Sequence, residues 1–417
     1  MRILILALGS RGDVLPYAVL GQALQAAGHR VAIATFESFR PMIAQAGPEL
    51  YAIPGDAETM LKVAAQGGML DRRSHPLQVM RALARSYGQL ASLPALGLDM
   101  TVLRGIDLIL NQLPAHLYGP DIAEYLGIPW AIVAVMPLVR TRHRPLVGTP
   151  TALSGLPGYN LLTYRLGEQM GWQLFRGAIN RWRRQVGLRP QPLSGPYGEI
   201  QRRHVPFING FSEQVVPRAP DWGEHVHLTG WWYPREPDWQ PPPDLLSFLE
   251  AGPPPVFFGL GSMPVSDPAR VTAIVVETVR LTGRRAILHA GWAGLGGDLP
   301  PEIFPMTYAP YGWLFPRMAA IVHHGGSGTT GFALASGVPS LVVPFVFDQF
   351  YWGERTAALC AGPRPVPYRE LGVERLAAAI DTAVNDASIR TGAARLGETL
   401  RAEDGVGKAV ALVERLI

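Results

Sequence analysis

Residues 319–331 read Ala-Ala-Ile-Val-His-His-Gly-Gly-Ser-Gly-Thr-Thr-Gly, an apolar run that ends at two histidines and passes into a glycine-rich turn. The residues that follow, through Ala335, are typical of a helix. A turn of this kind from a strand into a helix leaves unpaired N–H groups at the positive end of the helix dipole, where phosphate binds readily. We therefore expect a diphosphate site formed by Gly326, Gly328, His324, Ser327, Thr329 and Thr330. The alternative is a tight turn that needs glycine for its dihedrals, with two incidental histidines.

Downstream, Gly337-Val-Pro-Ser-Leu-Val-Val-Pro-Phe-Val-Phe-Asp-Gln349 predicts a buried strand that ends in an acid and an amide. Asp348 and Gln349 at the carboxyl end of a strand have the hydrogen-bonding groups to hold vicinal sugar hydroxyls. The alternative is that Asp348 caps a helix over 350–359, and both roles are compatible.

The chain has 417 residues, which favours two domains of about 200 residues each. In the first half, the sequence predicts a strand at 2–8, a helix at 14–27, a strand at 30–35, a helix at 119–126, strands at 106–110 and 130–135, and a helix at 161–186. In the second half it predicts strands at 255–261, 285–290, 303–307, 319–323 and 340–343, with helices between them. Alternating strands and helices indicate an α/β fold with parallel sheets. A proline-rich stretch over 230–243 separates the halves.

The start of the chain carries a second glycine-bearing turn, Gly9-Ser-Arg-Gly-Asp13, between the first predicted strand and helix. A carboxylate placed there can act as a general base. Asp13 is equally an ordinary helix N-cap, and Gly9 with Gly12 falls short of a dinucleotide fingerprint.

Residues 308–362 resemble the donor-binding signature of the family 1 glycosyltransferases of the GT-B fold. The signature positions are occupied in order by His324-x-Gly326-x-Gly328-Thr329-Thr330, Gly337-Val-Pro339 and Asp348-Gln349. The likeness is strongest to the sterol and glycopeptide branch, through Asp348–Gly353 and Gly291–Leu295, and spans nearly the full chain. It implies two Rossmann-like domains that face each other across a cleft. The implied segments are an acceptor domain 1–229, a linker 230–243, a nucleotide-sugar domain 244–400 and a C-terminal helix 401–417 that packs back on the first domain.

The resemblance assigns roles to single residues. It implies diphosphate contact by His324, sugar contact by Asp348 and Gln349, and proton abstraction by Asp13. Gly9, Ser10, Arg11 and Gly12 are expected to form a phosphate loop near the acceptor. Ser262 is implied to approach the phosphates, and Trp292 is a candidate stacking surface for the base. Phe332 stands where plant members carry a glutamate for the ribose, so a deoxythymidine donor is compatible with the sequence alongside a uridine donor.

Composition narrows the remaining classes. A formal charge of +4 does not indicate nucleic-acid binding. The single cysteine, Cys360, excludes an intrachain disulfide and fits a cytoplasmic protein. His225 and His227 lack a third metal ligand at suitable spacing, and there is no acid-x-acid motif of the kind that metal-dependent glycosyltransferases use, so we expect neither a metal nor a cofactor. Arginines cluster at 72, 73, 81 and 85, at 176, 181, 183 and 184, and at 202 and 203. These clusters are solvated helix faces or contacts to an anionic acceptor or a membrane surface.

The expected reaction is an inverting transfer of a hexose from a UDP- or dTDP-sugar to a small lipophilic or natural-product acceptor. The expected partners are the donor and a small or lipid acceptor, in a monomer or homodimer with peripheral membrane contact left open. The alternatives are a non-catalytic homologue that binds nucleotide sugar or a partner enzyme, a nucleotide-sugar epimerase, and a nicotinamide oxidoreductase. The last lacks the third fingerprint glycine and a well-placed ribose acid.

Overall fold

The computed structural model describes residues 1–64, 97–98, 100–112, 118–234, 238–263, 265, 267–291 and 294–416. The chain forms two compact units. Unit 1 comprises Met1–Tyr233 and Asp404–Ile417, and unit 2 comprises Pro234–Glu403. The chain thus leaves unit 1 once and returns to it for its last helix.

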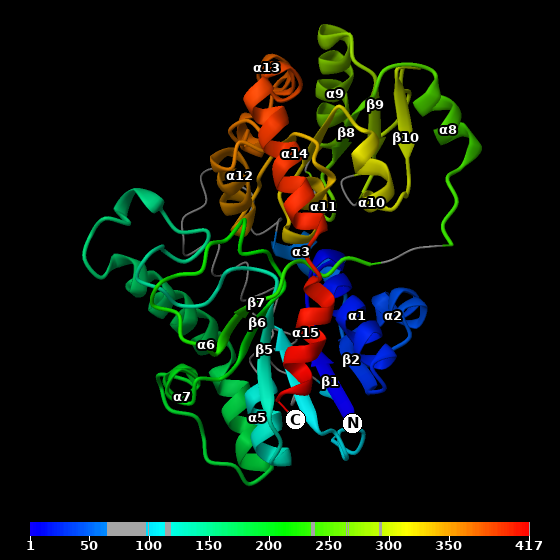
Figure 1. Ribbon diagram of the computed structural model, residues 1–417. Coiled ribbons are helices and arrows are strands. Elements are labelled where there is room, and N and C mark those ends of the chain that lie inside the picture. Colours follow the sequence, from blue (N-terminus) through cyan, green and yellow to red (C-terminus); the bar gives the residue numbers. More distant parts are fainter. Residues whose placement is uncertain are drawn as a thin grey trace. The chain divides into compact units, whose positions relative to one another are not determined.

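Unit 1 alternates strands and helices along most of its length (Figure 1). Its elements are β1 (Arg2–Leu6), α1 (Arg11–Ala26), β2 (Arg30–Phe36), η1 (Glu37–Phe39), α2 (Arg40–Ala46), β3 (Glu49–Ile53), α3 (Ala57–Ala64), β4 (Leu108–Gln112), α5 (Gly119–Leu126), β5 (Trp130–Ala134), η4 (Thr151–Leu153), α6 (Tyr159–Gln185), α7 (Tyr197–Arg202), β6 (Phe207–Asn209), β7 (Val226–Leu228) and α15 (Gly405–Glu414).

The strands of unit 1 form one parallel seven-stranded sheet in the order β3-β2-β1-β4-β5-β6-β7. The central strand β1 is an unbroken apolar run, and Ile3, Leu4, Ile5 and Leu6 are fully buried. Such runs are typical of parallel strands that are covered on both faces. The C-terminal helix α15 packs against α1, and His29 Nε2 lies 3.4 Å from a carboxylate oxygen of Glu414.

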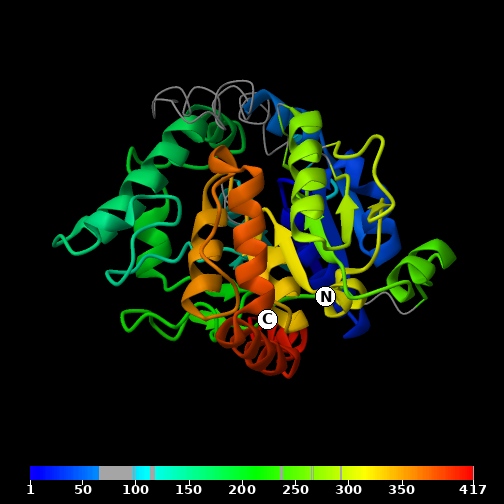
Figure 2. The same cartoon turned by 90° about the horizontal axis from the view of Figure 1, so that it is seen from above.

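Unit 2 follows the same plan in a smaller form (Figure 2). Its elements are α8 (Pro243–Glu250), β8 (Val256–Gly259), α9 (Pro268–Thr282), β9 (Ala286–His289), β10 (Ile303–Met306), α10 (Tyr311–Leu314), η5 (Phe315–Arg317), β11 (Ala320–His323), α11 (Ser327–Ser336), β12 (Ser340–Val342), α12 (Asp348–Ala358), η6 (Tyr368–Glu370), α13 (Val373–Asn385) and α14 (Ala387–Arg401). Its parallel five-stranded sheet has the order β10-β9-β8-β11-β12.

Side chains that alternate along β8 build two separate cores, one on each face of this sheet. Phe258 packs with residues of α9 and α13, such as Val275 and Ile380. Its neighbour Phe257 packs with residues of α10 and α11, such as Leu314 and Ala333. Because successive strand residues point to opposite faces, this alternation places helices on both sides of the sheet.

The α/β class and the parallel sheets are confirmed, with shifts at the ends of the predicted elements. Helix α1 begins at Arg11 rather than at residue 14, which places Asp13 inside the helix. The strands β3, β6 and β7 were not predicted. β6 and β7 have only three residues each, too few to show a period.

The expected linker begins too early. Trp231 and Trp232 are almost fully buried in unit 1, where the indole N–H of Trp232 donates to the Thr229 hydroxyl at 3.0 Å. The boundary therefore falls after Tyr233, and the return to unit 1 comes at Asp404 rather than at 401. The proline-rich composition suggested a linker from residue 230 onward, but the burial of Trp231 and Trp232 makes these residues part of unit 1.

Candidate functional site

The order of the strands in unit 2 reverses between β8 and β11. From β8 the sheet grows outward to β9 and β10, and on the other side of β8 lie β11 and β12. Open α/β sheets bind ligands outside the carboxyl ends of the strands at such a switch point. His323 at the end of β11 is in register with Gly259 at the end of β8. The turns that follow the two strands therefore start next to each other.

His324 occupies a slot between two glycines. An added Cβ at Gly261 would lie 2.6 Å from Cε1 of the ring, and one at Gly326 would lie 2.4 Å from Nε2. Any larger residue at either position would displace the imidazole. The Nδ1 atom of His324 is buried and has no hydrogen-bond partner among the described residues. Burial lowers the pKa of His324 to about 4, so the ring is neutral near pH 7.

The turn leads into α11 without an acidic residue. Gly326 is the N-cap, and the first turn of the helix contains no carboxylate. The first N–H groups of a helix have no partner within it, and the helix dipole favours an anion there. An added Cβ at Gly328 would meet nothing within 4 Å, and its φ is not in the left-handed region. The fold does not require this glycine, so its missing side chain leaves room for a ligand.

The three hydroxyls of the turn differ in orientation. Thr330 is fully buried, and its Oγ1 donates to the carbonyl of Gly326 at 2.9 Å. Ser327 is also buried, whereas Thr329 is partly exposed. We expected all three hydroxyls to lie beside the unpaired N–H groups at the start of α11, and among them only Thr329 is partly exposed. The hydroxyl of Thr330 instead fixes the start of α11.

His323 is a residue whose role the sequence did not indicate. It is fully buried, its Nδ1 accepts the N–H of Gly325 at 3.1 Å, and its Nε2 lies 2.7 Å from the Ser340 hydroxyl on β12. Since Nδ1 accepts, the proton resides on Nε2 and is donated to Ser340. Burial and the neighbouring His324 lower the pKa of His323 to about 3. His323 thus holds the backbone from which His324 projects.

Asp348 and Gln349 open helix α12. Asp348 Oδ2 accepts the indole N–H of the buried Trp352 at 2.9 Å. Gln349 is buried, and its Oε1 accepts the backbone N–H groups of Phe345 at 2.8 Å and of Val346 at 3.2 Å. Asp348 is the first helical residue rather than the N-cap, which is Phe347. Both side chains therefore stabilise the strand-to-helix turn and the first turn of α12.

Two phenylalanines flank the site in different ways. Phe347 is about half exposed and has φ of 48°, an uncommon conformation for a side chain of its size. Strain of this kind concentrates at ligand sites, and it immediately precedes Asp348. Phe332 instead lies against the core of unit 2, where its ring meets Tyr311 edge-on with centroids 6.0 Å apart.

The remaining predicted donor contacts lie in the loops after β8 and β9. Ser262 is partly exposed, and the sulfur of the next residue, Met263, accepts the side-chain N–H of Gln349 at 3.1 Å. An added Cβ at Gly291 would lie 2.5 Å from the carbonyl oxygen of Gly261, so the two loops touch. Trp292 lies outside the described residues. The structure thus gathers the turns after β8, β9, β11 and β12 at one edge of the sheet.

The turn after β1 in unit 1 holds Asp13. Its Oδ2 accepts both the N–H of Ser10 at 2.8 Å and the hydroxyl of Ser10 at 2.9 Å. An added Cβ at Gly9, where φ is 131°, would lie 2.5 Å from the same oxygen. Ser10 is the N-cap of α1, and Asp13 folds back over the turn from inside the helix. Burial raises the pKa of Asp13, although its hydrogen bonds with Ser10 oppose this shift.

A carboxylate at the start of α1 changes what this turn can bind. Gly12 is exposed and an added Cβ would meet only the Ser10 hydroxyl, at 3.7 Å, and Arg11 is exposed. The Asp13 carboxylate nevertheless occupies the position in which the helix dipole would attract a phosphate. The geometry of Gly9, Ser10, Arg11 and Gly12 therefore favours a proton acceptor over an anion site.

Two buried polar residues that the sequence did not single out lie near this turn, and one of them, Gln112, fixes it. Gln112, at the end of β4, accepts the N–H of Leu8 and donates to the carbonyl of Asp13 at 3.3 Å. Because β1 and β4 are neighbours at the point where the strand order reverses, their carboxyl ends meet. Tyr17 lies one turn below Asp13, and burial together with the charge of Asp13 raises its pKa far above the usual range.

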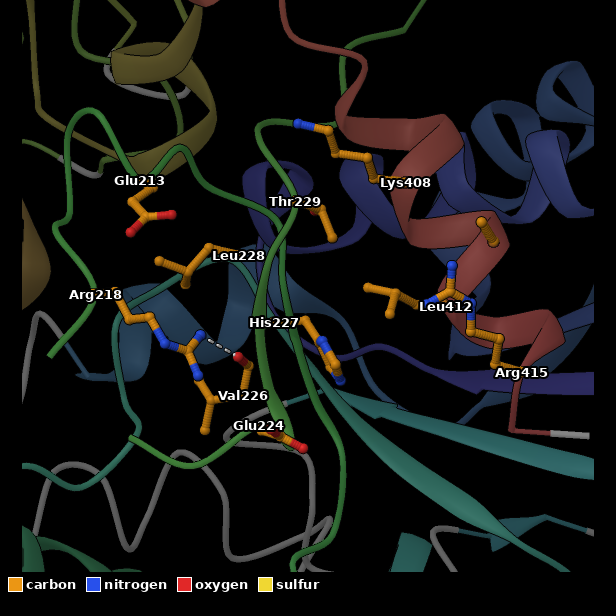
Figure 3. A pocket seen from close by; sticks show the side chains of 11 residues that line it. Glu213, Arg218, Glu224, Val226, His227, Leu228, Thr229, Lys408, Leu412 and Arg415 are labelled. Atoms are coloured by element: carbon orange, nitrogen blue, oxygen red, sulfur yellow. Dashed lines mark hydrogen bonds between the residues drawn. The ribbon is translucent and has the colours of Figure 1, made fainter. Parts of the chain in front are cut away.

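Unit 1 also contains a cavity of about 460 Å³ between strand β7 and helix α15 (Figure 3). Its walls carry charges of both signs, and the guanidinium of Arg218 donates to the Val226 carbonyl at 2.6 Å. The charged lining residues are Glu213, Arg218, Glu224, Lys408 and Arg415, and His227 also lines the cavity. None of the lining residues belongs to the turn after β1. Within the described ranges, no group of three or more His, Cys, Asp or Glu side chains is arranged to hold a metal.

Both halves of the chain match known domain families. Residues 3–143 match the glycosyltransferase family 28 N-terminal domain, and residues 287–412 match the erythromycin biosynthesis protein CIII-like C-terminal domain. Together with the two parallel-sheet units, these matches show that the chain belongs to the GT-B glycosyltransferases. The resemblance derived from the signature positions is confirmed.

Curated relatives of the chain include sterol glucosyltransferases from fungi and plants. A sterol 3-beta-glucosyltransferase of Emericella nidulans is 36% identical over 431 residues that cover all of this chain and 30% of that protein. A sterol 3-beta-glucosyltransferase of Arabidopsis thaliana is 33% identical over 98% of this chain and 64% of that protein. The chain therefore spans about a third of the length of the fungal relatives and under two thirds of the plant one.

Solved structures agree on the fold. The glycosyltransferase of kitacinnamycin superposes with a TM-score of 0.66 at 21% identity, over 100% of this chain and 98% of that chain. The glycosyltransferase SnogD from Streptomyces nogalater gives 0.65 at 22% identity, with both chains fully covered. A Streptomyces glycosyltransferase complexed with thymidine diphosphate gives 0.63 at 23% identity, over 100% of this chain and 99% of that chain. At these identities the likeness concerns the fold.

Among the described residues, no helix is both long enough and apolar enough to span a bilayer.

Proposed function

We propose that the protein transfers a hexose from a nucleoside diphosphate sugar to a hydroxyl group of a lipophilic acceptor of the sterol type. The observation that carries this proposal is the turn after β11. There a neutral, buried imidazole with an unpaired Nδ1 stands beside a helix N-terminus that contains no acid. This arrangement suits a diphosphate that gains negative charge as it leaves.

Each unit contributes one half of the chemistry. In unit 2, the amides of Gly328 and Thr329 and the ring of His324 bind the diphosphate, and the groups at the start of α12 hold the sugar. In unit 1, Asp13 accepts the proton of the acceptor hydroxyl, whose oxygen then forms a bond to the anomeric carbon as the bond to the diphosphate breaks. A carboxylate whose pKa is raised by burial is a better base than an ordinary one. No metal is assigned a role.

The activities for which the relatives are named guide the choice of substrates. The fungal and plant relatives act, by name, on the 3-beta position of sterols as glucosyltransferases, and they match almost the whole of this chain. Two structural neighbours were solved with thymidine diphosphate. Glucose and a sterol-like hydroxyl are thus the first choices. Phe332, which packs in the core, offers no carboxylate to a ribose, so both UDP and dTDP are candidates for the carrier.

The test is direct. The purified chain is incubated with UDP-glucose or dTDP-glucose and detergent-dispersed sterols, and the glycoside and the released nucleoside diphosphate are quantified by mass spectrometry. We expect a glycoside in equimolar amount to the diphosphate. If nucleotide sugar binds but neither product forms with any acceptor, the protein is a non-catalytic nucleotide-sugar-binding homologue.

A further inference from the structure

The outward face of α6 in unit 1 carries an apolar stripe. Leu162, Leu166 and Met170 are 50%, 54% and 46% exposed and follow one another at four-residue spacing. Residues at this spacing lie on one face of a helix. The opposite face is buried through Tyr164, Trp172, Phe175, Ile179 and Trp182. The first half of α6 therefore presents apolar side chains to solvent as well as to the core.

Three further exposed leucines lie in segments next to α6. Leu153 and Leu156, 45% and 57% exposed, immediately precede α6, and the side-chain amide of Asn160 donates to the Ser154 carbonyl at 3.3 Å. Leu193, 66% exposed, lies in a loop whose backbone accepts the side-chain N–H of Gln173, three residues after Met170, at 3.0 Å. Six of the thirteen exposed large hydrophobic side chains in the described part of the chain are thus held on or beside one helix. A concentration of exposed apolar side chains on and beside one helix is typical of an interaction site.

Helix α6 has a positive net charge. The helix contains five arginines and a single acid, Glu168. Glu168 is paired with Arg140, whose Nε lies 2.6 Å from its carboxylate, and the buried Arg183 is paired with Asp121 and Glu124. The other four arginines form no ion pair with any described residue. These are Arg165, Arg176, Arg181 and Arg184, and the last two continue the outward face beyond the apolar stripe.

We propose that this face of α6, with Leu153, Leu156 and Leu193, docks on an anionic lipid surface. Exposed leucines enter the boundary between headgroups and acyl chains, while arginines bind the phosphates of the headgroups. A second copy of the chain fits less well, because a symmetric contact would bring the unpaired arginines of two copies together. The proposal rests on the proposed function in one respect: an acceptor dissolved in a bilayer is reached from its surface.

The experiment measures partitioning of the full chain onto vesicles. Cosedimentation is compared for vesicles of phosphatidylcholine alone and of phosphatidylcholine mixed equally with phosphatidylglycerol, at low and high salt. The test variants are Leu162→Gln with Leu166→Gln, and Arg181→Gln with Arg184→Gln. The matched control is Leu281→Gln, since Leu281 is 62% exposed on α9 of unit 2. Glycoside formation with detergent-dispersed acceptor and the oligomeric state in solution are measured for each.

We expect the wild-type chain to bind the anionic vesicles, less so at high salt, and each double variant to lose about tenfold in partitioning, with the control unchanged. Transfer to detergent-dispersed acceptor stays at the wild-type level in all of them. Equal binding to both kinds of vesicle, no binding, or the same loss in the control overturns the proposal. So does a dimer in solution that the leucine variant abolishes. Vesicle binding without any transfer leaves this surface intact and refutes the proposed function instead.

Discussion

The turns after β1 and after β11 are built alike but differ in the charge at the start of the helix that follows. Each follows a central parallel strand at the point where the strand order of its sheet reverses, and each leads into a helix through glycines. In the first turn, the start of the helix is already occupied by the carboxylate of Asp13. In the second, the start of the helix holds no acid and lies beside an uncharged imidazole.

In the proposed reaction, this difference in charge assigns proton abstraction to the turn after β1 and binding of the leaving diphosphate to the turn after β11. A helix dipole that is satisfied by its own carboxylate no longer attracts an anion, and the carboxylate becomes available as a base. A helix dipole left unsatisfied attracts a diphosphate. We therefore expect the residue at the third helical position, Asp13 in α1 and Thr329 in α11, to determine whether such a turn accepts a proton or holds a leaving group.

The largest effect is expected from Asp13→Asn. The amide keeps the shape of the side chain and cannot accept the proton, so transfer should fall by about 10²–10⁴-fold while donor binding is retained. The measurements are kcat for glycoside formation and calorimetric affinity for nucleoside diphosphate.

Ser10→Ala is the matched control for Asp13. It removes the hydroxyl that stabilises the charged carboxylate, so the acidic limb of the profile of kcat/KM against pH should move to higher pH with activity retained. Near-wild-type transfer by Asp13→Asn would assign Asp13 to capping alone.

The next effect is on donor affinity. His324→Ala removes a buried hydrogen bond to a charged ligand, which corresponds to a loss of about 10–100-fold in affinity for nucleoside diphosphate. Binding should also be accompanied by proton uptake, because a nearby diphosphate raises the pKa of a histidine that is otherwise held at about 4. Calorimetry in buffers of different ionisation enthalpy measures both quantities. An unchanged affinity contradicts contact between His324 and the diphosphate.

The two glycines of the α11 turn should separate folding from binding. Gly326→Ala places a Cβ against His324 and should destabilise the protein by about 1–3 kcal/mol. Gly328→Ala meets open space and should leave stability within about 1 kcal/mol or raise it, while donor affinity falls because the methyl group enters the ligand's space. Thermal unfolding with and without nucleoside diphosphate tests both variants. Equal destabilisation by the two substitutions would show that both glycines serve only the fold.

The smallest effect concerns stability against pH. The pKa values of His323 and His324 are lowered from 6.5 to about 3 and about 4, so the unfolded chain binds protons that the folded chain does not between pH 6.5 and those values. Stability therefore falls as the pH decreases through this window. His323→Asn, whose amide oxygen can accept the Gly325 N–H in place of Nδ1, should flatten the dependence of the unfolding midpoint on pH. A variant as pH-sensitive as the wild type contradicts the buried neutral His323.

The sequence predicted the parts of the fold that repeat a strong pattern. The apolar runs at β1, β8 and β11 and the glycine turns after them were sufficient for the fold class and for the position of the candidate site. Trp231 and Trp232 were missed as part of unit 1 because their burial depends on tertiary packing. The strands β6 and β7 were missed because three residues are too few to show the alternation of apolar and polar residues that is typical of a strand.

Within the site, the residue types were predictable and their partners were not. His323 and Gln112 act through contacts to segments 17 and 104 residues away, to Ser340 and Leu8. Nothing local distinguishes them from incidental polar residues. The direction of the Thr330 hydroxyl and the commitment of the Gln349 amide to backbone N–H groups likewise depend on the packed turn.

The measurement that most directly tests the anion site of unit 2 is a calorimetric titration of the full chain with UDP and dTDP, in a chelator and in excess Mg²⁺. The account predicts the same affinity under both conditions for the wild type and a weaker affinity for His324→Ala. Binding that disappears in the chelator, or that is indifferent to the loss of the imidazole, would contradict it.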